Sequence, residues 1–237
     1  MTDRSFFWSN ISPNGISVHP GERLNQYGFR GPIVDSNKKI LFAGCSFTYG
    51  AGVAYHETFA KLTAEKLGQD WSCLNIGIPG SGILEQVASI SWALTNFKID
   101  KICWYISDPI RTTVLINNYQ KLRFLVNRDF SFLKNDHIKD MNRFIENHLY
   151  FERNHLHQLK YSIYTIFSMI KQKNIKCYTT CWIDSFDNEI QDIKDEFNVK
   201  SMGNINWLDK GTDDGHPGPK SHAEFADRII GILENDK

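Results

Sequence analysis

The sequence lacks the features of membrane, secreted and nucleic-acid-binding chains. No segment reaches the ~18 uninterrupted apolar residues of a membrane span, and the polar start, Met1-Thr-Asp-Arg-Ser, precedes no apolar signal stretch. Lysine plus arginine (27) balance aspartate plus glutamate (27), so no net field attracts nucleic acid or an anionic membrane. We therefore expect a cytoplasmic protein with neither a nucleic-acid partner nor a membrane span.

The cysteines lack the spacing of a zinc site. There are five, an odd number, and three of them (Cys73, Cys103 and Cys177) lie in or beside short apolar runs. Cys177 and Cys181 form a pair, but no second pair completes a tetrahedral set. We predict buried free thiols and no bound metal.

The chain also lacks repeats and low-complexity segments, and its 237 residues fit one large α/β domain. Turn signals at Pro13-Asn14-Gly15, Pro20-Gly21 and Gly31-Pro32 indicate an irregular N-terminal arm over residues 1–37 that packs on the domain. The domain itself is expected over residues 38–237.

Apolar runs alternate with amphipathic segments along this domain. Continuous apolar runs are typical of parallel strands that are covered on both faces, so the pattern predicts an α/β fold with a parallel sheet between helical layers. The predicted strands are 39–43, 72–76, 99–106 and 175–182, and the predicted helices are 57–69, 83–97 and 220–233.

A longer segment, residues 110–170, interrupts this alternation. It reads as a helical insertion, mainly helical from about Phe124 to Ile170, and it is rich in aromatic residues. We expect it to form a lid over the site or the surface of a homo-oligomer.

Ligands of open parallel sheets bind beyond the carboxyl ends of the strands. The first predicted strand is followed there by Gly44-Cys-Ser46-Phe-Thr48. A serine at such a strand-to-helix turn exposes its hydroxyl, and its amide can donate to an oxyanion. A phosphate-cradling or purely structural turn is the alternative. Thr48 replaces the last glycine of Gly-x-Ser-x-Gly, which disfavours an α/β-hydrolase elbow.

The loop before the last helix supplies a base and a carboxylate. In Asp213-Asp-Gly-His216-Pro217, Asp213 is three residues before His216 and can fold back to reach the imidazole. A serine nucleophile needs such a pair, since the carboxylate orients the base and stabilises the imidazolium. An ordinary surface turn rich in aspartate, glycine and proline is the alternative.

The order of these blocks resembles the SGNH (GDSL-like) hydrolase superfamily. Gly44-Cys-Ser46-Phe-Thr48 resembles its first block, Asn75-x-Gly77-x-x-Gly80 its second, and Asp213-x-x-His216-Pro217 its last. The arm sequence 25–31, Asn-Gln-Tyr-Gly-Phe-Arg-Gly, also resembles a segment that precedes the first block in some members.

The resemblance implies a flavodoxin-like three-layer α/β/α fold and a serine esterase. It implies Ser46 as nucleophile, His216 as general base and Asp213 as the residue that orients it. The oxyanion hole would comprise the amides of Ser46 and Gly80 and a side chain of a third block. The implied substrates are small acyl esters, lipids and acetylated carbohydrates, and no cofactor is implied.

The third block departs from the family pattern. The position of the expected asparagine holds Ser107, in Ser107-Asp-Pro-Ile-Arg111, and Cys45 replaces the usual aspartate before the nucleophile. We predict Ser107 as the third oxyanion donor, with a shorter reach. Arg111 is a source of compensating positive charge or a substrate contact, and a surface or ion-paired arginine is the alternative. Losing one oxyanion donor costs about 2–4 kcal/mol of transition-state stabilisation.

Further candidates come from their place near these blocks. Tyr49 and His56 follow Ser46 closely and are possible substrate contacts, whereas His222 is expected on the exposed face of the last helix. The aromatic residues that end near the same sheet edge suit a sugar-bearing substrate; they are Trp104, Tyr105 and Trp182.

These residues favour hydrolysis of a small acyl or carbohydrate ester. Two alternatives stay open: an acyltransferase at the same site, because water access decides between the two reactions, and a non-catalytic binding or assembly module on a degenerate scaffold. The altered third block favours the second alternative, and the intact Ser46, Asp213 and His216 argue against it.

Overall fold

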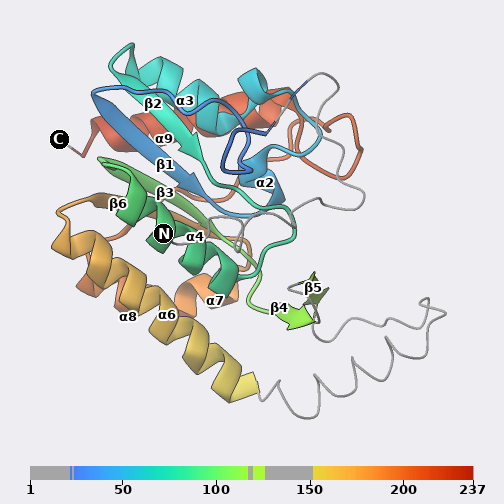
Figure 1. The fold of residues 1–237 in the computed structure, drawn as a ribbon, viewed down its shortest axis with the longest axis vertical. Helices are drawn as coiled ribbons and strands as arrows, with labels where there is room; N and C mark the ends of the chain where they lie inside the picture. The colour runs from blue at the N-terminus through green and yellow to red at the C-terminus, as the bar shows by residue number, and fades with distance from the viewer. Residues whose placement is uncertain (1–21, 23, 117–119, 126–151, 237) are drawn as a thin grey trace.

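A computed structural model describes residues 22, 24–116, 120–125 and 152–236. Its centre is a parallel sheet with the strand order β2-β1-β3-β6-β7 (Figure 1). The strands are β1 (Lys38–Ala43), β2 (Trp71–Asn75), β3 (Lys101–Ile106), β6 (Lys176–Cys181) and β7 (Lys200–Ser201). The four longer strands confirm the sequence prediction, and the two-residue β7 was not predicted.

Helices cover both faces of this sheet, as the sequence predicts. On one face lie α3 (Phe59–Leu67) and α9 (Pro219–Glu234), and on the other lie α4 (Ile83–Asn96) and α6 (Glu152–Gln172) (Figure 1). Two further short helices, α7 (Asp184–Glu189) and α8 (Gln191–Glu196), follow β6. The result is a three-layer α/β/α sandwich of the flavodoxin-like type.

Alternation along the central strands divides the core into two clusters. In β1, Leu41 packs in the cluster beneath α4 and α6, whereas Ile40 and Phe42 pack in the cluster beneath α3 and α9. In β3, Trp104 and Tyr105 divide in the same way. Because both faces of each strand are buried, the strands appear in the sequence as continuous apolar runs.

The strand order determines where a ligand can bind. The chain leaves β1, adds β2 on one side of it, and then crosses to place β3 on the other side. In such sheets the crevice lies at this reversal, outside the carboxyl ends of the strands. Ser46 lies three residues after the end of β1, and Ser107 directly follows β3.

The predicted helical insertion at 110–170 is wrong over its first part. Residues Arg111–Ile116 (β4) and Gln120–Leu125 (β5) form an antiparallel pair in which Arg111 lies opposite Leu125. The β-branched run after Arg111, Thr-Thr-Val-Leu-Ile, favours a strand. Helix α6 confirms the helical prediction at the other end, and residues 126–151 lie outside the described part of the chain.

All five cysteines are free and buried, as predicted. Burial raises the pKa of the Cys103 and Cys177 thiols, which leaves them protonated and unreactive. Within the described residues, no helix has both the length and the apolar character needed to cross a membrane.

Candidate active site

Ser46 occupies the turn between β1 and a single-turn helix, α2 (Ser46–Tyr49). Gly44 has φ 155°, and a Cβ there would collide with the Thr48 side chain, so the turn requires glycine. Helix α2 ends at Gly50 in the left-handed conformation. Ser46 is therefore held at the carboxyl edge of the sheet by a short turn between two glycines.

Asp213 and His216 form a hydrogen-bonded pair, as the sequence predicts. Asp213 Oδ2 lies 2.7 Å from His216 Nδ1, while Oδ1 accepts hydrogen bonds from the amides of Gly215 and His216. Desolvation acts to raise the pKa of Asp213, but these hydrogen bonds and the imidazole outweigh it and hold the pKa below its usual value. The carboxylate is thus ionised and fixed against one ring nitrogen.

The loop that carries this pair packs on the segment that follows Ser46. The Thr212 amide donates to Gly52 O at 2.7 Å, and a Cβ on Gly52 would lie 2.7 Å from Asp213 Oδ1. The His216 ring meets the Phe47 ring edge-on at 5.8 Å. Since Phe47 adjoins Ser46 in the chain, the structure brings the three predicted catalytic residues into one neighbourhood.

Ser46 and His216 are not hydrogen-bonded to each other within the described residues. The Ser46 hydroxyl instead donates to Cys45 Sγ at 4.0 Å, a long and weak contact. Catalytic hydrogen bonds are often loose before substrate binds.

Asp209 holds the end of the same loop, and sequence reasoning did not single it out. Its carboxylate accepts hydrogen bonds from the amides of Lys220 and Ser221 at the start of α9, and from the Ser221 hydroxyl. Pro219 occupies the first turn of the helix, where no amide is needed. Asp209 lies ten residues before Pro219, and the N-cap position is Gly218, so no local capping pattern in the sequence identifies Asp209.

The glycine block after β2 is fastened to the Ser46 turn. The Asn75 side chain donates to Thr48 O at 2.7 Å and accepts from the Gly77 amide at 2.9 Å. The Ile78 amide donates to Gly44 O. Asn75 therefore has a structural role, because it joins the second block to the turn that carries Ser46.

Two amides near Ser46 are available as oxyanion donors. Within the described residues, neither the Ser46 amide nor the Gly80 amide donates a hydrogen bond to another protein group. Gly80 has φ 74°, a left-handed backbone conformation that glycine adopts without strain. The role of these two amides as oxyanion donors stays a prediction.

The third-block residue Ser107 is fully buried, with none of its surface exposed, and its hydroxyl is held by Gln86. Gln86 Nε2 donates to the hydroxyls of Ser107 and Ser81, and Oε1 accepts from Trp104 Nε1 at 2.8 Å and more weakly from the Ser107 amide. All four hydrogen-bonding positions of the Gln86 amide are used. Sequence reasoning missed Gln86, since a lone glutamine in an amphipathic helix carries no signal.

The arm folds around Asn25. Its side-chain amide donates to Gly31 O at 2.8 Å, and its oxygen accepts from the amides of Tyr27 and Phe29. Phe29 is buried in the core beneath α4 and α6. This compact turn presents the next residue, Arg30, to the end of α2.

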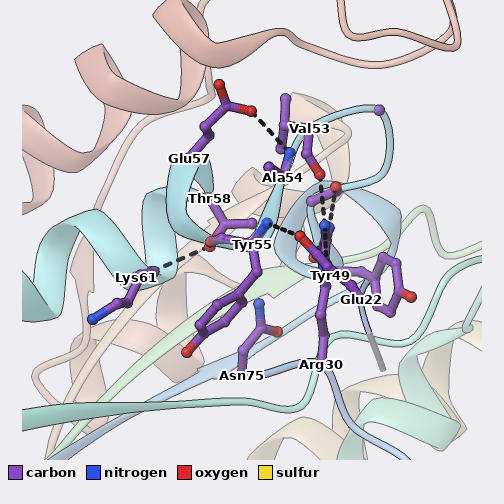
Figure 2. Close-up of polar contacts among 12 residues, drawn as sticks. Glu22, Arg30, Tyr49, Val53, Ala54, Tyr55, Glu57, Thr58, Lys61 and Asn75 are labelled. Carbon is purple, nitrogen blue, oxygen red and sulfur yellow. Dashed lines mark hydrogen bonds and ion pairs between the residues drawn. The ribbon is translucent and has the colours of Figure 1, made fainter. Parts of the chain in front are cut away.

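Arg30 links the arm to the Ser46 turn (Figure 2). Its guanidinium donates to the carbonyl oxygens of Tyr49, Gly50 and Val53 at 3.1, 2.5 and 2.6 Å, and it forms an ion pair with Glu22 at 2.7 Å. A cation suits this position because α2 ends there and its carbonyl groups need donors. The arm is thus a structural support of the nucleophile turn.

Two predicted substrate contacts lie in different surroundings. Tyr49 is 5% exposed, and its ring packs against the Arg30 guanidinium at 5.1 Å, so it contributes to the packing of the arm. His56 is exposed in the 3-10 turn η1 (Tyr55–Glu57). Within the described residues, no hydrogen bond or ion pair joins His56 to Ser46, Asp213 or His216.

Arg111 and an aromatic group extend the site beyond the predicted triad. The Arg111 guanidinium lies over the Trp182 ring at 5.5 Å, and the Trp182 ring lies 4.4 Å from that of Phe47. Trp207, which is 50% exposed, meets Phe47 from another direction at 5.8 Å. Trp182 was expected near this edge, whereas Trp207 was missed because its surroundings are irregular.

The charged side chains of the site do not gather in the manner of a metal centre. Among the residues that the structure describes, no three histidine, cysteine, aspartate or glutamate side chains lie close enough together to hold a metal ion.

No protein-family model and no curated protein matches the sequence. Solved structures do match: TesA has a TM-score of 0.55 at 12% identity over 84% of this chain and 99% of its own. A putative lipolytic protein of the G-D-S-L family from Desulfitobacterium hafniense DCB-2 has a TM-score of 0.55 at 11% sequence identity, and the match covers 83% of this chain and 100% of that protein. Est24, a carbohydrate acetylesterase from Sinorhizobium meliloti, has a TM-score of 0.52 at 9% sequence identity, and the match covers 84% of this chain and 100% of Est24.

These likenesses, all at 12% identity or less, show the fold of the chain. The chain has the SGNH (GDSL-like) hydrolase fold, and the resemblance inferred from the sequence blocks is confirmed at the level of the fold.

Proposed function

We propose that the protein is a serine esterase of the SGNH type that acts on a small acyl ester or an acetylated carbohydrate. The observation that carries this proposal is the Asp213–His216 pair, joined at 2.7 Å, on a loop that packs against the turn of Ser46. Fold alone does not define an activity. A base that is oriented by a carboxylate, on a loop packed against a serine at a helix start, is the arrangement that activates a serine nucleophile.

In the acylation step, the Ser46 hydroxyl attacks the ester carbonyl carbon. His216 Nε2 accepts the hydroxyl proton, and Asp213, bound to Nδ1, fixes the tautomer and stabilises the imidazolium. The carbonyl oxygen becomes an oxyanion, for which the amides of Ser46 and Gly80 are the proposed donors. Collapse of this intermediate breaks the ester bond, and His216 returns the proton to the leaving alcohol.

Deacylation repeats the same chemistry with water. His216 accepts a proton from water, whose oxygen attacks the acyl-Ser46 carbonyl, and then returns the proton to the Ser46 oxygen as the acid leaves. Both steps need a neutral histidine, so the rate should fall on acidification. The acetylated carbohydrate as substrate is supported by Est24, a carbohydrate acetylesterase of the same fold, and by the aromatic side chains around Phe47.

The test compares wild type with Ser46→Ala for hydrolysis of p-nitrophenyl acetate. We expect turnover by wild type and loss of at least about 1000-fold in kcat in the variant. Ser91→Ala, on a partly exposed position of α4, is the matched control and should keep wild-type activity. Equal rates for wild type and Ser46→Ala would overturn the proposal.

One observation favours a second candidate, a non-catalytic binding module. The third-block hydroxyl, Ser107, is buried and bound to Gln86 rather than open to a ligand. Under this candidate, wild type and Ser46→Ala bind an acetylated sugar with equal affinity in calorimetry and neither releases acetate. Acyl transfer to a sugar hydroxyl, the third reading, would appear as acetate transferred to an added sugar instead of to water.

A further inference from the structure

Arg111 has the surroundings of a ligand-binding side chain. In the part of the chain that the structure describes, it has no acidic partner, and its buried Nε has no hydrogen-bond acceptor. A buried donor without an acceptor costs about 1–3 kcal/mol and is rare in folded proteins. A group supplied by a ligand would remove this cost.

The position of Arg111 relates it to the catalytic residues. Its backbone carbonyl abuts Gly82, close to the proposed oxyanion amide of Gly80. Its guanidinium lies over Trp182, whose ring packs at a tilt of 37° against that of Phe47, the residue after Ser46. A continuous row of contacts therefore connects Arg111 to the nucleophile turn.

The chemistry of this row combines one cation with flat aromatic surfaces. Guanidinium binds carboxylate and phosphate groups through paired hydrogen bonds. Aromatic faces pack against the apolar faces of ring-shaped ligands, and Trp207 offers such a face with half of its surface exposed. The overall charge of the protein is zero, so a preference for anions has to come from a local cation such as Arg111.

We propose that the preferred substrate is an anionic ester, an acetylated sugar that bears a carboxylate or a phosphate, with Arg111 binding the anion. This rests on the proposed esterase function and adds the substrate class to it. Arg111 acts in binding, so its removal should raise KM for charged substrates more than it lowers kcat.

The experiment measures kcat/KM for acetylated glucose, acetylated glucuronate and acetylated glucose 6-phosphate. We expect wild type to prefer at least one charged sugar by roughly 10- to 100-fold, the range of a charge-assisted hydrogen bond. The two charged sugars distinguish carboxylate from phosphate recognition. Arg111→Gln should remove the preference, Arg111→Lys should keep part of it, and Lys98→Gln, at an exposed site, should leave it unchanged.

Two controls separate this inference from the esterase proposal. Hydrolysis of neutral p-nitrophenyl acetate, dependent on Ser46, tests the esterase alone. Equilibrium binding of the same sugars to Ser46→Ala, measured by calorimetry, tests the anion site without turnover. Added salt should weaken the binding of the charged sugars but not of the neutral one. Trp182→Phe should weaken the binding of all three sugars and keep the preference for the charged ones.

Several results would overturn the inference. Equal kcat/KM for neutral and charged sugars, with equal affinities for the Ser46→Ala protein, excludes an anion site. An equal loss of kcat on every substrate in Arg111→Gln assigns the side chain to oxyanion stabilisation instead. If p-nitrophenyl acetate is not hydrolysed but charged sugars still bind more tightly through Arg111, the esterase proposal and the substrate class that rests on it fail, and Arg111 is left as an anion-binding side chain.

Discussion

Arg30 and Arg111 both reach the Ser46 turn, the first directly and the second through Trp182, and their surroundings are opposite. The Arg30 side chain is 2% exposed and bonds three carbonyl oxygens and the Glu22 carboxylate. Arg111 lies over an aromatic ring and, within the described residues, has no acidic partner. One charge is saturated by the protein, and the other remains available.

The difference separates an arginine that stabilises the Ser46 turn from one that we propose binds the substrate. On the arm side, the Arg30 guanidinium is paired with three carbonyl oxygens and the Glu22 carboxylate, which fixes the backbone that holds Ser46. On the third-block side, the buried hydroxyl of Ser107 is paired with Gln86, and Arg111 Nε has no hydrogen-bond acceptor among the described residues. We expect changes on the arm side to act mainly on stability and changes on the other side to act mainly on substrate choice.

Replacing Arg30 tests the arm side with the largest expected effect. Arg30→Met removes the cation that pairs with Glu22 and the guanidinium donors of three carbonyl groups, so we expect a loss of about 3–5 kcal/mol in the free energy of unfolding. Urea unfolding followed by circular dichroism measures it. Lys98→Met, at an exposed site, is the control. A loss below about 1 kcal/mol would mean that the arm does not support the turn.

A buried histidine on the same side predicts acid sensitivity. Burial, then the charge of Arg30, lowers the pKa of His222 to about 4; Asp209 opposes this shift and His216 adds to it. An unfolded histidine, with a pKa of about 6.5, binds its proton first, so stability is lost as pH falls from about 6.5 to about 4, by about 3 kcal/mol in total.

The measurement is the free energy of unfolding at pH 7 and at pH 4.5. His222→Gln should lose less stability between these values than wild type, because it removes the group that the fold keeps neutral. His56→Gln, exposed in η1, should behave as wild type. Identical pH dependence in wild type and His222→Gln would show that the buried imidazole is not the cause.

Gln86 tests the buried network of the third-block side. Gln86→Leu leaves Trp104 Nε1 and two serine hydroxyls without their partner, and we expect a loss of about 2–3 kcal/mol in stability. Because Ser81 adjoins the Gly80 amide, kcat should fall as well. Gln158→Leu, exposed on α6, is the matched control. Full stability in Gln86→Leu would show that the network is dispensable.

Ser107→Ala carries the smallest expected effect. Its hydroxyl has no exposed surface and is bound to Gln86, so we expect kcat for p-nitrophenyl acetate to fall less than about tenfold. An oxyanion donor would cost about 100- to 1000-fold. A loss of that larger size would restore the role that the sequence predicted for Ser107 and would require the hydroxyl to turn toward the substrate.

The sequence predicts the sheet better than the segments around it. Buried parallel strands such as β3 are short apolar runs, and their detection needs no tertiary information. The β4–β5 pair lies in a weakly patterned segment that the sequence predicts as a helical insertion, and its pairing depends on contact between two separate runs of the chain. His222 was expected on an exposed face, but the packing of α9 on α3 stacks its ring on Phe59 and buries it.

The site divides in the same way. Asp213 and His216 are three residues apart, so their contact is local and can be predicted from spacing. The partners of Arg30 and Gln86 come from distant parts of the chain and depend on tertiary packing, which a single sequence does not display. Ser107 was placed correctly at the carboxyl end of β3, but its burial beneath Gln86 could not be foreseen.

The central claim is that the Asp213–His216 pair activates Ser46 as a nucleophile. Labelling with a fluorophosphonate ester, followed by peptide mass spectrometry, tests it most directly. The account predicts one phosphonyl adduct, on Ser46, formed rapidly by wild type and at least about 100-fold more slowly by His216→Ala. Absence of an adduct on Ser46, or an equal labelling rate in His216→Ala, would contradict it.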